Sequence, residues 1–321
     1  MTQTLRVLSE DQVKSLYDRD AAWNAVENAY RAFGQSSDIQ SKPSAMRVIG
    51  PLTGTPNFGQ MRVVKGAVVP EIGAGGVLLY SRDYPHLYLW DIKSEASTAL
   101  IACGWLTGER VALTAALTMK KLARPDIKKI ALFGGGKNFG APICRLVAGE
   151  WSNAEVNVVT SRMETATAFA AQMPANVAPA TAADAARDAD VIITITMTKA
   201  PFIHAGMMKP GAILLSMGSP HEVDIAVLHE CDALIVDDLN YASEQGDIGA
   251  WLKRGELSED ELKRRLRANI GEIVLGQKKG RLNDNERLLA VIQGLTACDV
   301  AVNKLIFDRA VAQGVGQVVS F

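Results

Sequence analysis

The first part of the chain changes from helical to strand-like spacing of its apolar residues. Residues 5–8 predict a short strand, and Ser9 with Gln12 makes a capping box for the helix that follows. That helix repeats large apolar residues at helical spacing: Trp23, Val26, Tyr30 and Phe33. From residue 45 to residue 90, short alternating segments lie between Gly and Pro turns, at 46–49, 61–65, 76–80 and 87–90. These segments predict a mostly antiparallel sheet.

The middle of the chain predicts a parallel sheet. Helices are expected over 94–103 and 107–123, and Pro125 breaks the chain after them. Strands and helices then alternate, as parallel sheets require. The expected strands are 130–133, 156–160, 191–196, 212–217 and 233–236, with helices that include 163–172 and 225–229. A last helix over 286–313 lies beyond this unit and can return to the first domain, so we expect one domain from 1–123 and 287–321 and an inserted domain over 124–286.

A glycine-rich segment stands between a predicted strand and a predicted helix. Residues 134–140, GGGKNFG, directly follow the strand and open a helical stretch over 141–151. A Rossmann fold needs glycine there for a sharp turn, for close approach of the backbone to a pyrophosphate, and for an anion site at the helix start. Gly134 and Gly136 match the first two positions of G-x-G-x-x-G, but the third falls on Phe139. Either Gly140 takes that packing role one residue later, or Phe139 is accommodated in its place.

This segment predicts a nicotinamide cofactor. The loop residues expected to bind it are Gly134, Gly135, Gly136, Lys137, Asn138 and Phe139, and the ends of later strands add Thr196, Met217 and Gly218. The second strand ends in Thr160-Ser161-Arg162 without the acid that holds a ribose hydroxyl. Ser161 and Arg162 can accept a 2′-phosphate, which favours NADP, but Arg162 can equally stack over adenine with NAD. The expected cofactor is therefore NAD(P), with the choice open.

Composition narrows the class of protein. The chain has 321 residues, 34 Lys plus Arg against 35 Asp plus Glu, and a formal net charge of -1. This balance gives no reason to expect nucleic acid or an acidic membrane as partner. The four cysteines lie far apart, without a C-x-x-C pair or a Cys/His cluster, so we expect reduced core residues and no metal site. No secretory signal or membrane-length apolar run is present, which favours a soluble cytoplasmic protein.

Several separate stretches resemble the ornithine cyclodeaminase and mu-crystallin family. They are 110–117 running into 121–125, the glycine loop, 276–281, and the tail through 299–301, 309–310 and 314–316. The resemblance covers nearly the whole chain. It implies a Rossmann domain plus an α+β substrate and dimerisation domain built from both chain ends, and hence a homodimer. Members of the family use NAD(P) to reduce imines to amino acids, to run the reverse oxidation, or to cyclise ornithine, and mu-crystallin is a binding protein.

The resemblance also assigns candidate catalytic residues. It gives the substrate carboxylate to Arg47, Lys65 and Arg110, each at a position where its motif has a cation. A guanidinium can hold a carboxylate bidentately, and an ammonium can protonate an imine nitrogen. From the residues alone, Arg47 and Lys65 can equally be solvent-facing cations on strands. Arg110 lies near a helix start, where a positive charge opposes the dipole and needs another reason to be there.

One departure from the family bears on the reaction. Cyclodeaminases carry an aspartate shortly after the strand that ends here at Met217, but residues 218–224 read GSPHEVD, with no acid at the aligned place. Cyclodeamination is therefore not favoured, while simple hydride transfer survives the loss. His221 either replaces the lost group or is a surface residue.

The expected substrate is a small imino acid. Arg47, Lys65 and Arg110, with Arg82 and His86 on a nearby loop, form a set of cations that two carboxylates would balance. The leading expectation is therefore reduction of iminosuccinate to aspartate, as in the iminosuccinate reductases that the chain resembles. A cyclodeaminase-type lyase and a non-catalytic NADP-binding protein like mu-crystallin are the alternatives.

Overall fold

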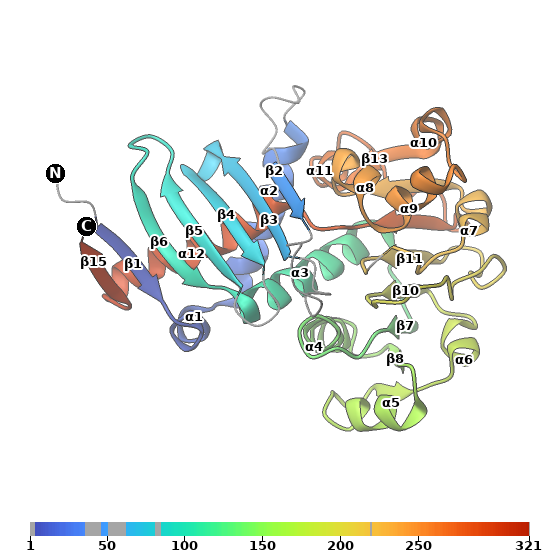
Figure 1. Ribbon diagram of the computed structural model, residues 1–321. Helices are drawn as coiled ribbons and strands as arrows, with labels where there is room; N and C mark the ends of the chain where they lie inside the picture. Colours follow the sequence, from blue (N-terminus) through green and yellow to red (C-terminus); the bar gives the residue numbers. More distant parts are fainter. Residues whose placement is uncertain (1–3, 36–45, 51–61, 81–84, 219, 321) are drawn as a thin grey trace. The chain divides into compact units, whose positions relative to one another are not determined.

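The computed structural model describes residues 4–35, 46–50, 62–80, 85–218 and 220–320. The chain divides into two compact units, residues 1–110 with 295–321 (unit 1) and residues 111–294 (unit 2). Figure 1 labels the elements of both. Helix α3, Gly104–Leu122, begins in the first unit and ends in the second.

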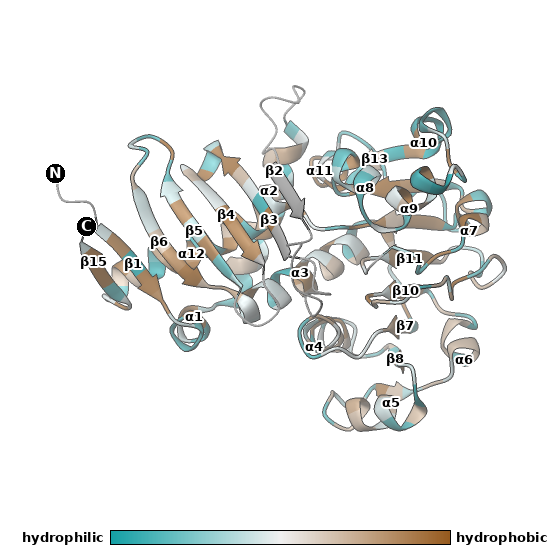
Figure 2. Cartoon of the chain, in the orientation of Figure 1, coloured by the Kyte–Doolittle hydropathy of each residue, from teal (hydrophilic) through white to brown (hydrophobic). Residues whose placement is uncertain are grey.

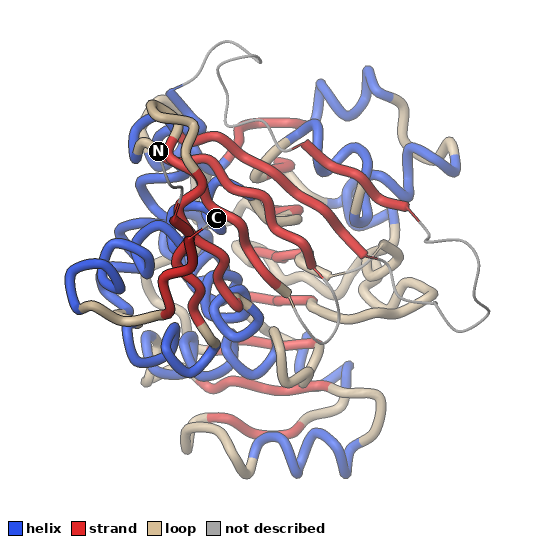
Figure 3. The backbone as a smooth tube through the Cα atoms, turned by 60° about the vertical axis from the view of Figure 1, so that its left-hand side comes forward, coloured by secondary structure: helices blue, strands red, loops and turns tan. Residues whose placement is uncertain are grey.

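Unit 1 is built on a seven-stranded sheet. Its strand order is β15-β1-β6-β5-β4-β3-β2. The bounds are β1 Thr4–Leu8, β2 Met46–Gly50, β3 Arg62–Val69, β4 Ala74–Tyr80, β5 His86–Asp91, β6 Ser97–Ala102 and β15 Gln317–Ser320. All neighbours from β2 to β6 pair antiparallel, which confirms the predicted sheet, and β1 joins β6 in parallel. Figure 3 shows these strands side by side.

The two faces of this sheet differ in burial. Helix α12, Thr296–Gln313, packs on β3, β4 and β5, and α2, Arg19–Gln35, packs on α12. Gly76 permits this contact, because a Cβ there would lie 3.0 Å from Val300 of α12. The opposite face carries large apolar side chains in solvent: Val68 is 41%, Leu79 48% and Tyr88 38% exposed. We call these three residues the exposed face of the sheet.

Short elements complete unit 1. They are α1, Glu10–Leu16, and the 3-10 turn η1, Pro70–Ile72. Ser9 accepts from the backbone of Gln12, whose side chain accepts from the backbone of Ser9, so the predicted capping box is confirmed.

The helix predicted over 94–103 is wrong, because this segment contains strand β6. Ser94 resembles a helix cap in the sequence, but its backbone N–H and its hydroxyl both donate to the Asp91 carboxylate in a turn. The following residues alternate in burial rather than repeating every third or fourth position, with Ala99 and Ile101 fully buried. Pairing with β5 and β1 on either side decides the conformation.

Unit 2 has the fold that the strand–helix alternation predicts. Its eight-stranded sheet has the order β13-β12-β14-β11-β10-β7-β8-β9, and every pair is parallel. The strands are β7 Lys129–Phe133, β8 Glu155–Val159, β9 Val177–Pro179, β10 Val191–Thr194, β11 Ile213–Ser216, β12 Ala233–Val236, β13 Leu266–Asn269 and β14 Leu288–Val291. Their largely hydrophobic character is visible in Figure 2. The order turns back between β7 and β10, which is the switch point where Rossmann folds bind their ligands.

Helices connect the parallel strands. They are α4 Gly140–Glu150, α5 Met163–Ala170, α6 Ala182–Ala186, α7 Ile225–Glu230, α8 Leu239–Glu244, α9 Gly246–Arg254, α10 Glu259–Arg265 and α11 Ile270–Val274. The expected α/β class, with a Rossmann domain and a second α+β domain, is confirmed.

The helix predicted over 286–313 is wrong in its first part. Residues 288–291 form β14, which pairs with β11 and β12, and all four are fully buried. The sequence assigned this segment to the first domain, whereas its hydrogen bonds place it in the parallel sheet. A short strand that is buried on both faces does not alternate polar and apolar residues. In the sequence it therefore cannot be distinguished from the start of the apolar helix that begins at Thr296.

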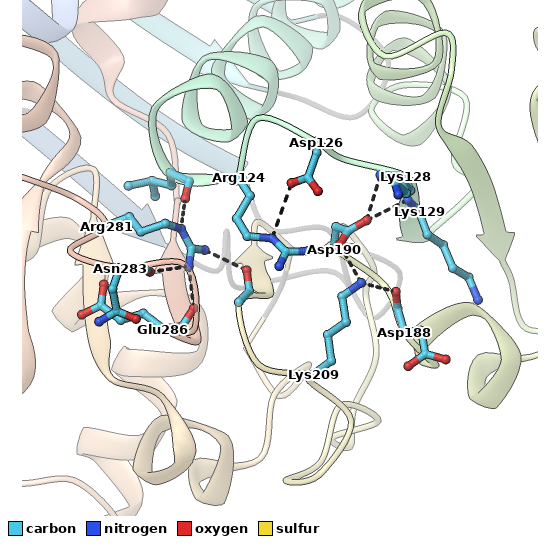
Figure 4. Close-up of polar contacts among 12 residues, drawn as sticks. Arg124, Asp126, Lys128, Lys129, Asp188, Asp190, Lys209, Arg281, Asn283 and Glu286 are labelled. Carbon is cyan, nitrogen blue, oxygen red and sulfur yellow. Dashed lines mark hydrogen bonds and ion pairs between the residues drawn. The ribbon is translucent and has the colours of Figure 1, made fainter.

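Charged side chains join the loops at the amino ends of the parallel strands (Figure 4). Asp190 accepts the backbone N–H groups of Lys128 and Lys129 and pairs with Arg124 and Lys209. Arg281 donates to the carbonyls of Leu122, Gly211, Asn283 and Glu286. The 276–281 stretch that carries part of the family resemblance therefore serves the architecture of the sheet, at the edge opposite the glycine loop.

The remaining sequence expectations concern cysteines, membranes and metals. Cys103, Cys144, Cys231 and Cys298 are buried and form no disulfide, as expected for core residues. Within the ranges given above, no helix is long and apolar enough to cross a membrane. The same residues contain no group of three or more His, Cys, Asp or Glu that could hold a metal ion.

Candidate cofactor and substrate sites

Two glycines of the loop after β7 are required by close packing of the backbone. Gly134 has a φ of +124°, and a Cβ there would lie 2.4 Å from the carbonyl oxygen of Ile195. A Cβ on Gly140 would lie 2.1 Å from the carbonyl oxygen of Gly134. Gly140 thus takes the third packing role of the glycine motif one residue late, and Phe139 becomes the N-cap of α4. This resolves the alternative that the sequence left open.

The third feature of the loop is open space where a pyrophosphate would lie. A Cβ on Gly136 would meet nothing within 4 Å. Helix α4 starts at Gly140 without a side-chain cap, and its Ala141 N–H donates to the Gly136 carbonyl at 3.0 Å. The positive end of the helix dipole lies at the loop. Lys137 and Asn138 are exposed beside it. The residues of this loop therefore fit the pyrophosphate of a dinucleotide, which needs exposed N–H donors and no side chain in the way.

The end of β8 carries the residues expected at the adenosine ribose. Ser161 and Arg162 are exposed, and the Thr160 hydroxyl donates to the carbonyl of Arg162 at 2.8 Å. Residues 159–162 contain no carboxylate, as the sequence indicates. The arrangement leaves a hydroxyl and a guanidinium at the position where NAD-specific folds place an acid.

A buried carboxylate that the sequence analysis missed joins the loops after β10 and β11. Glu222 accepts from the backbone N–H of Thr196 at 2.5 Å, from its hydroxyl at 2.6 Å, from the Thr194 hydroxyl at 2.8 Å, and from the backbone N–H of Gly218 at 3.0 Å. Its side chain is fully buried. Burial raises the pKa of Glu222 to about 7, and the nearby Asp247 carboxylate adds to the rise. Thr196 and Gly218, which the sequence predicts as cofactor-binding residues, thus both donate to the Glu222 carboxylate.

Asp247 fixes the loop that carries Glu222 and His221. One of its oxygens accepts the backbone N–H groups of residues 221, 222 and 223 at 3.0, 2.9 and 3.2 Å, and the other accepts the Ser216 hydroxyl at 2.7 Å. This holds His221 at a φ of +83°, a conformation that costs energy in a residue with a Cβ. Arg254 Nη1 lies 2.6 Å from His221 Nδ1. Because guanidinium cannot accept a hydrogen bond, Nδ1 accepts and the ring hydrogen is assigned to Nε2.

The expected substrate cations lie in unit 1. Arg47 and Lys65 are directly opposite each other in the β2–β3 register, and Lys65 is paired with Leu78 on β4. Lys65 is half-buried, and it shares its sheet face with Ala67, two residues further on, which is 2% exposed. The side chain of Arg47 and the whole of Arg82 lie outside the described residues.

Arg110 is held by a partner that the sequence analysis did not assign. Its Nε donates to Asp299 Oδ1 at 2.8 Å and its Nη2 to Asp299 Oδ2 at 3.0 Å. The two residues are 4% and 2% exposed. Burial disfavours the charged guanidinium, but the Asp299 carboxylate outweighs it, so the pKa of Arg110 is raised. Asp299 therefore supplies the reason for a cation near the start of α3, and the single acid in the apolar stretch 297–302 was its only signal in the sequence.

The register separates His86 from Lys65. Leu78 pairs with Leu87, and Leu79 pairs with His86 and Val64. Because neighbours along a strand point to opposite faces, His86 lies on the face away from Lys65. His86 begins β5 rather than lying on the expected loop, and its part in substrate binding stays a prediction.

Comparisons with known proteins agree with these features. The model of the ornithine cyclodeaminase/mu-crystallin family matches residues 81–314. The chain is 25% identical over 334 residues to alanine dehydrogenase of Archaeoglobus fulgidus, covering 98% of both chains. It is 27% identical over 244 residues to delta(1)-pyrroline-2-carboxylate reductase of Bacillus cereus, covering 73% of both. A solved archaeal alanine dehydrogenase dimer with bound NAD has the same fold, with a TM-score of 0.87 at 22% identity over 99% of this chain and 100% of that one.

Proposed function

Because the chain belongs to the ornithine cyclodeaminase/mu-crystallin family, we propose that it is an NAD(P)-dependent oxidoreductase that interconverts a small imino acid and its amino acid. The observation that carries the proposal is the open space at Gly136 before the start of α4, which has no side-chain cap, at the switch point of the parallel sheet. The relatives named alanine dehydrogenase and delta(1)-pyrroline-2-carboxylate reductase support the same reaction class.

In this proposal the protein residues bind the substrate and move one proton. Bound NAD(P)H supplies the hydride that reduces the C=N carbon. Arg47 and Arg110 hold the α-carboxylate. Arg110 does so through Nη1, because Asp299 takes Nε and Nη2 and fixes the plane of the guanidinium. The Lys65 ammonium gives a proton to the imine nitrogen, which becomes the amine.

The finer proposal is a dicarboxylic substrate, iminosuccinate, reduced to aspartate. Its support is the pair of cationic positions Arg47 and Lys65, which lie opposite each other in the register. Asp299 neutralises Arg110, so the excess of positive charge is smaller than the sequence alone indicates. The rival is the imine of pyruvate, reduced to alanine, which the Archaeoglobus fulgidus relative supports.

A substrate panel tests both levels of the proposal. Absorbance of NADH and NADPH is followed with oxaloacetate plus ammonia, with pyruvate plus ammonia, and with each keto acid alone. Oxidation that needs ammonia supports imine reduction, and the faster keto acid identifies the substrate. Proline and ammonia formed from ornithine, with no reaction in the panel, would instead make the protein a cyclodeaminase. Cofactor binding without any turnover would make it a binding protein.

The cofactor choice gives a prediction at Arg162. We propose that this exposed guanidinium binds the 2′-phosphate of NADP, a charge-assisted contact worth about 1.5–3 kcal/mol. Arg162→Ala should therefore raise KM for NADPH by about 10- to 100-fold and leave KM for NADH nearly unchanged. Arg187→Ala removes a similarly exposed arginine elsewhere in unit 2 and should change neither. Equal losses for the two cofactors would mean that Arg162 stacks on adenine instead.

The exposed face of the unit 1 sheet gives a second prediction. We propose that Val68, Leu79 and Tyr88 pack against a second copy of the chain, since three large apolar residues gather there and the archaeal neighbour is a dimer. Leu79→Glu places a charge in that contact and should convert a dimer to a monomer in light scattering. Leu282→Glu alters a leucine of unit 2 that is 62% exposed and should leave the dimer intact. A monomeric wild-type protein, or a dimeric Leu79→Glu variant, would refute this interface.

A further inference from the structure

Glu222 joins the ends of β10 and β11, next to the switch point of the parallel sheet. Ile195 donates its backbone N–H to the carbonyl of Phe133, and its own carbonyl lies against Gly134 of the glycine loop. The neighbouring Thr196 donates both its backbone N–H and its hydroxyl to Glu222. Glu222 therefore fixes Thr196, and the preceding residue, Ile195, contacts the loop expected to bind the pyrophosphate.

Gly218 shows how closely the same carboxylate packs under the loop after β11. A Cβ on Gly218 would lie 2.3 Å from Glu222 Oε1, so this position must be glycine while Glu222 is present. The backbone N–H of Gly218 donates to the other oxygen, Oε2. One side chain thus sets the backbone position after two adjacent strands, β10 and β11.

The partners of Glu222 favour an anion but permit a neutral acid. Two of its donors are backbone N–H groups, which can only donate. The Thr194 hydroxyl can change roles, because it also lies 3.5 Å from the carbonyl of Leu215 and can donate there while accepting from a protonated Glu222. Protonation of Glu222 therefore removes its negative charge while some of its hydrogen bonds remain.

We propose that Glu222 is a positioning residue for the nicotinamide half of the bound cofactor, and that its negative charge favours the oxidised, positively charged nicotinamide over the reduced one. The assignment to this half follows from the fold, since the adenosine half belongs over β7 and β8 and the other half over β10 and β11. The inference rests on the proposed cofactor binding. It assigns a role to an acid that makes no proton transfer to the substrate.

Other charged groups lie near the same loop, and their effect on nucleotide binding must be distinguished from that of Glu222. Asp247 of α9 lies close enough to raise the pKa of Glu222. Asp224, at the N-cap of α7, and the contact of His221 with Arg254 are nearby. Since the pKa of Glu222 is about 7, its charge develops between about pH 6 and pH 8. The preference for NAD+ over NADH should rise over this range.

The experiment measures dissociation constants of NAD+ and NADH for the full chain by calorimetry at pH 6 and pH 8. Both nucleotides carry the same phosphates, so the ratio of their dissociation constants isolates the charge on the nicotinamide. In the wild-type protein we expect this preference for NAD+ to increase about 3- to 10-fold from pH 6 to pH 8. In Glu222→Gln, which mimics the neutral acid, the ratio should stay constant. A constant ratio in the wild type would overturn the proposal without any variant.

Asp237→Asn is the matched control. Asp237 is another buried acid at a carboxyl strand end, and burial raises its pKa to about 6, but it accepts the backbone N–H groups of Asp238 and Gly294 rather than those of Thr196 or Gly218. This variant should keep the wild-type change in ratio. If Glu222→Gln weakened the binding of both nucleotides equally and kept the pH-dependent ratio of their dissociation constants, the role of Glu222 would be purely structural. Failure of all four nucleotides, NAD+, NADH, NADP+ and NADPH, to bind at any pH would instead refute the proposed function.

Thermal unfolding without cofactor supplies an independent readout. The pKa of Glu222 is raised in the folded state above the value of about 4.3 expected in the unfolded chain. The folded protein therefore binds more protons between these values, and stability is lost as the pH rises through the range. Between pH 5 and pH 8, Tm of the wild type should fall relative to Tm of Glu222→Gln. A parallel pH dependence of the two Tm values would contradict an ionising Glu222.

Discussion

Lys65→Met is expected to lower kcat by about 10²- to 10⁴-fold, the usual contribution of a positioned general acid. Met fills much of the volume of the lysine stem but carries no proton to give to the imine nitrogen. The variant should fold, because Lys65 lies on β3 at a half-buried position and its backbone pairing with Arg47 and Leu78 needs no side chain. Steady-state kinetics with the best substrate of the panel measure the effect.

The specificity of that result depends on two further measurements. The dissociation constant of the nucleotide should be nearly unchanged in Lys65→Met, because the cofactor residues lie in unit 2 and Lys65 in unit 1. Lys93→Met removes an exposed lysine from a turn of the same unit and should leave kcat as in the wild type. Unchanged turnover in Lys65→Met would remove Lys65 from the mechanism.

Gly136→Ala should weaken nucleotide binding by about 10- to 100-fold, which corresponds to the ~1–3 kcal/mol that an added methyl costs in a filled site. A Cβ at Gly136 meets no protein atom within 4 Å, so the fold itself should tolerate the change and Tm without cofactor should stay nearly constant. The methyl would instead occupy the space that the pyrophosphate needs. Calorimetric titration with NADH and NADPH measures the loss.

Gly149→Ala is the matched control for this substitution. Gly149 lies within α4 and a Cβ there also meets nothing within 4 Å. The change should raise stability by about 0.5–1 kcal/mol, because alanine favours a helix interior over glycine, and nucleotide binding should stay as in the wild type. If Gly136→Ala bound nucleotide as tightly as Gly149→Ala, the pyrophosphate would not lie at Gly136.

The parts of the fold that the sequence predicts are those with local signals. The order of strand, glycine loop and helix around residues 129–151 is predicted by the sequence, because each step depends on neighbouring residues. Strands β6 and β14 were misread, since their conformation depends on pairing with strands that are distant in sequence. Burial on both faces also removed the alternation that would have identified β14.

The site shows the same distinction between local and distant information. The sequence places the loop glycines between a strand and a helix, where the structure has them, but the one-residue offset of Gly140 required the position of the Gly134 carbonyl. The partner of Arg110 lies 189 residues away at Asp299. Glu222 is close in sequence to Gly218, but its other partners are on the preceding strand end, at Thr194 and Thr196. A single sequence carries no signal for such pairings beyond an acid in an otherwise apolar or glycine-rich stretch.

The most direct test of the account is the fate of a deuterium on the reactive carbon of the reduced nicotinamide. The protein is incubated with NADH or NADPH that carries deuterium in both hydrogen positions of this carbon, together with ammonia and each keto acid, and the amino acid formed is examined by mass spectrometry and NMR. The account predicts an amino acid with one deuterium at its α-carbon, formed in equal amount to the oxidised cofactor. Product without deuterium, or no product while the nucleotide stays bound and reduced, would contradict an imine reductase.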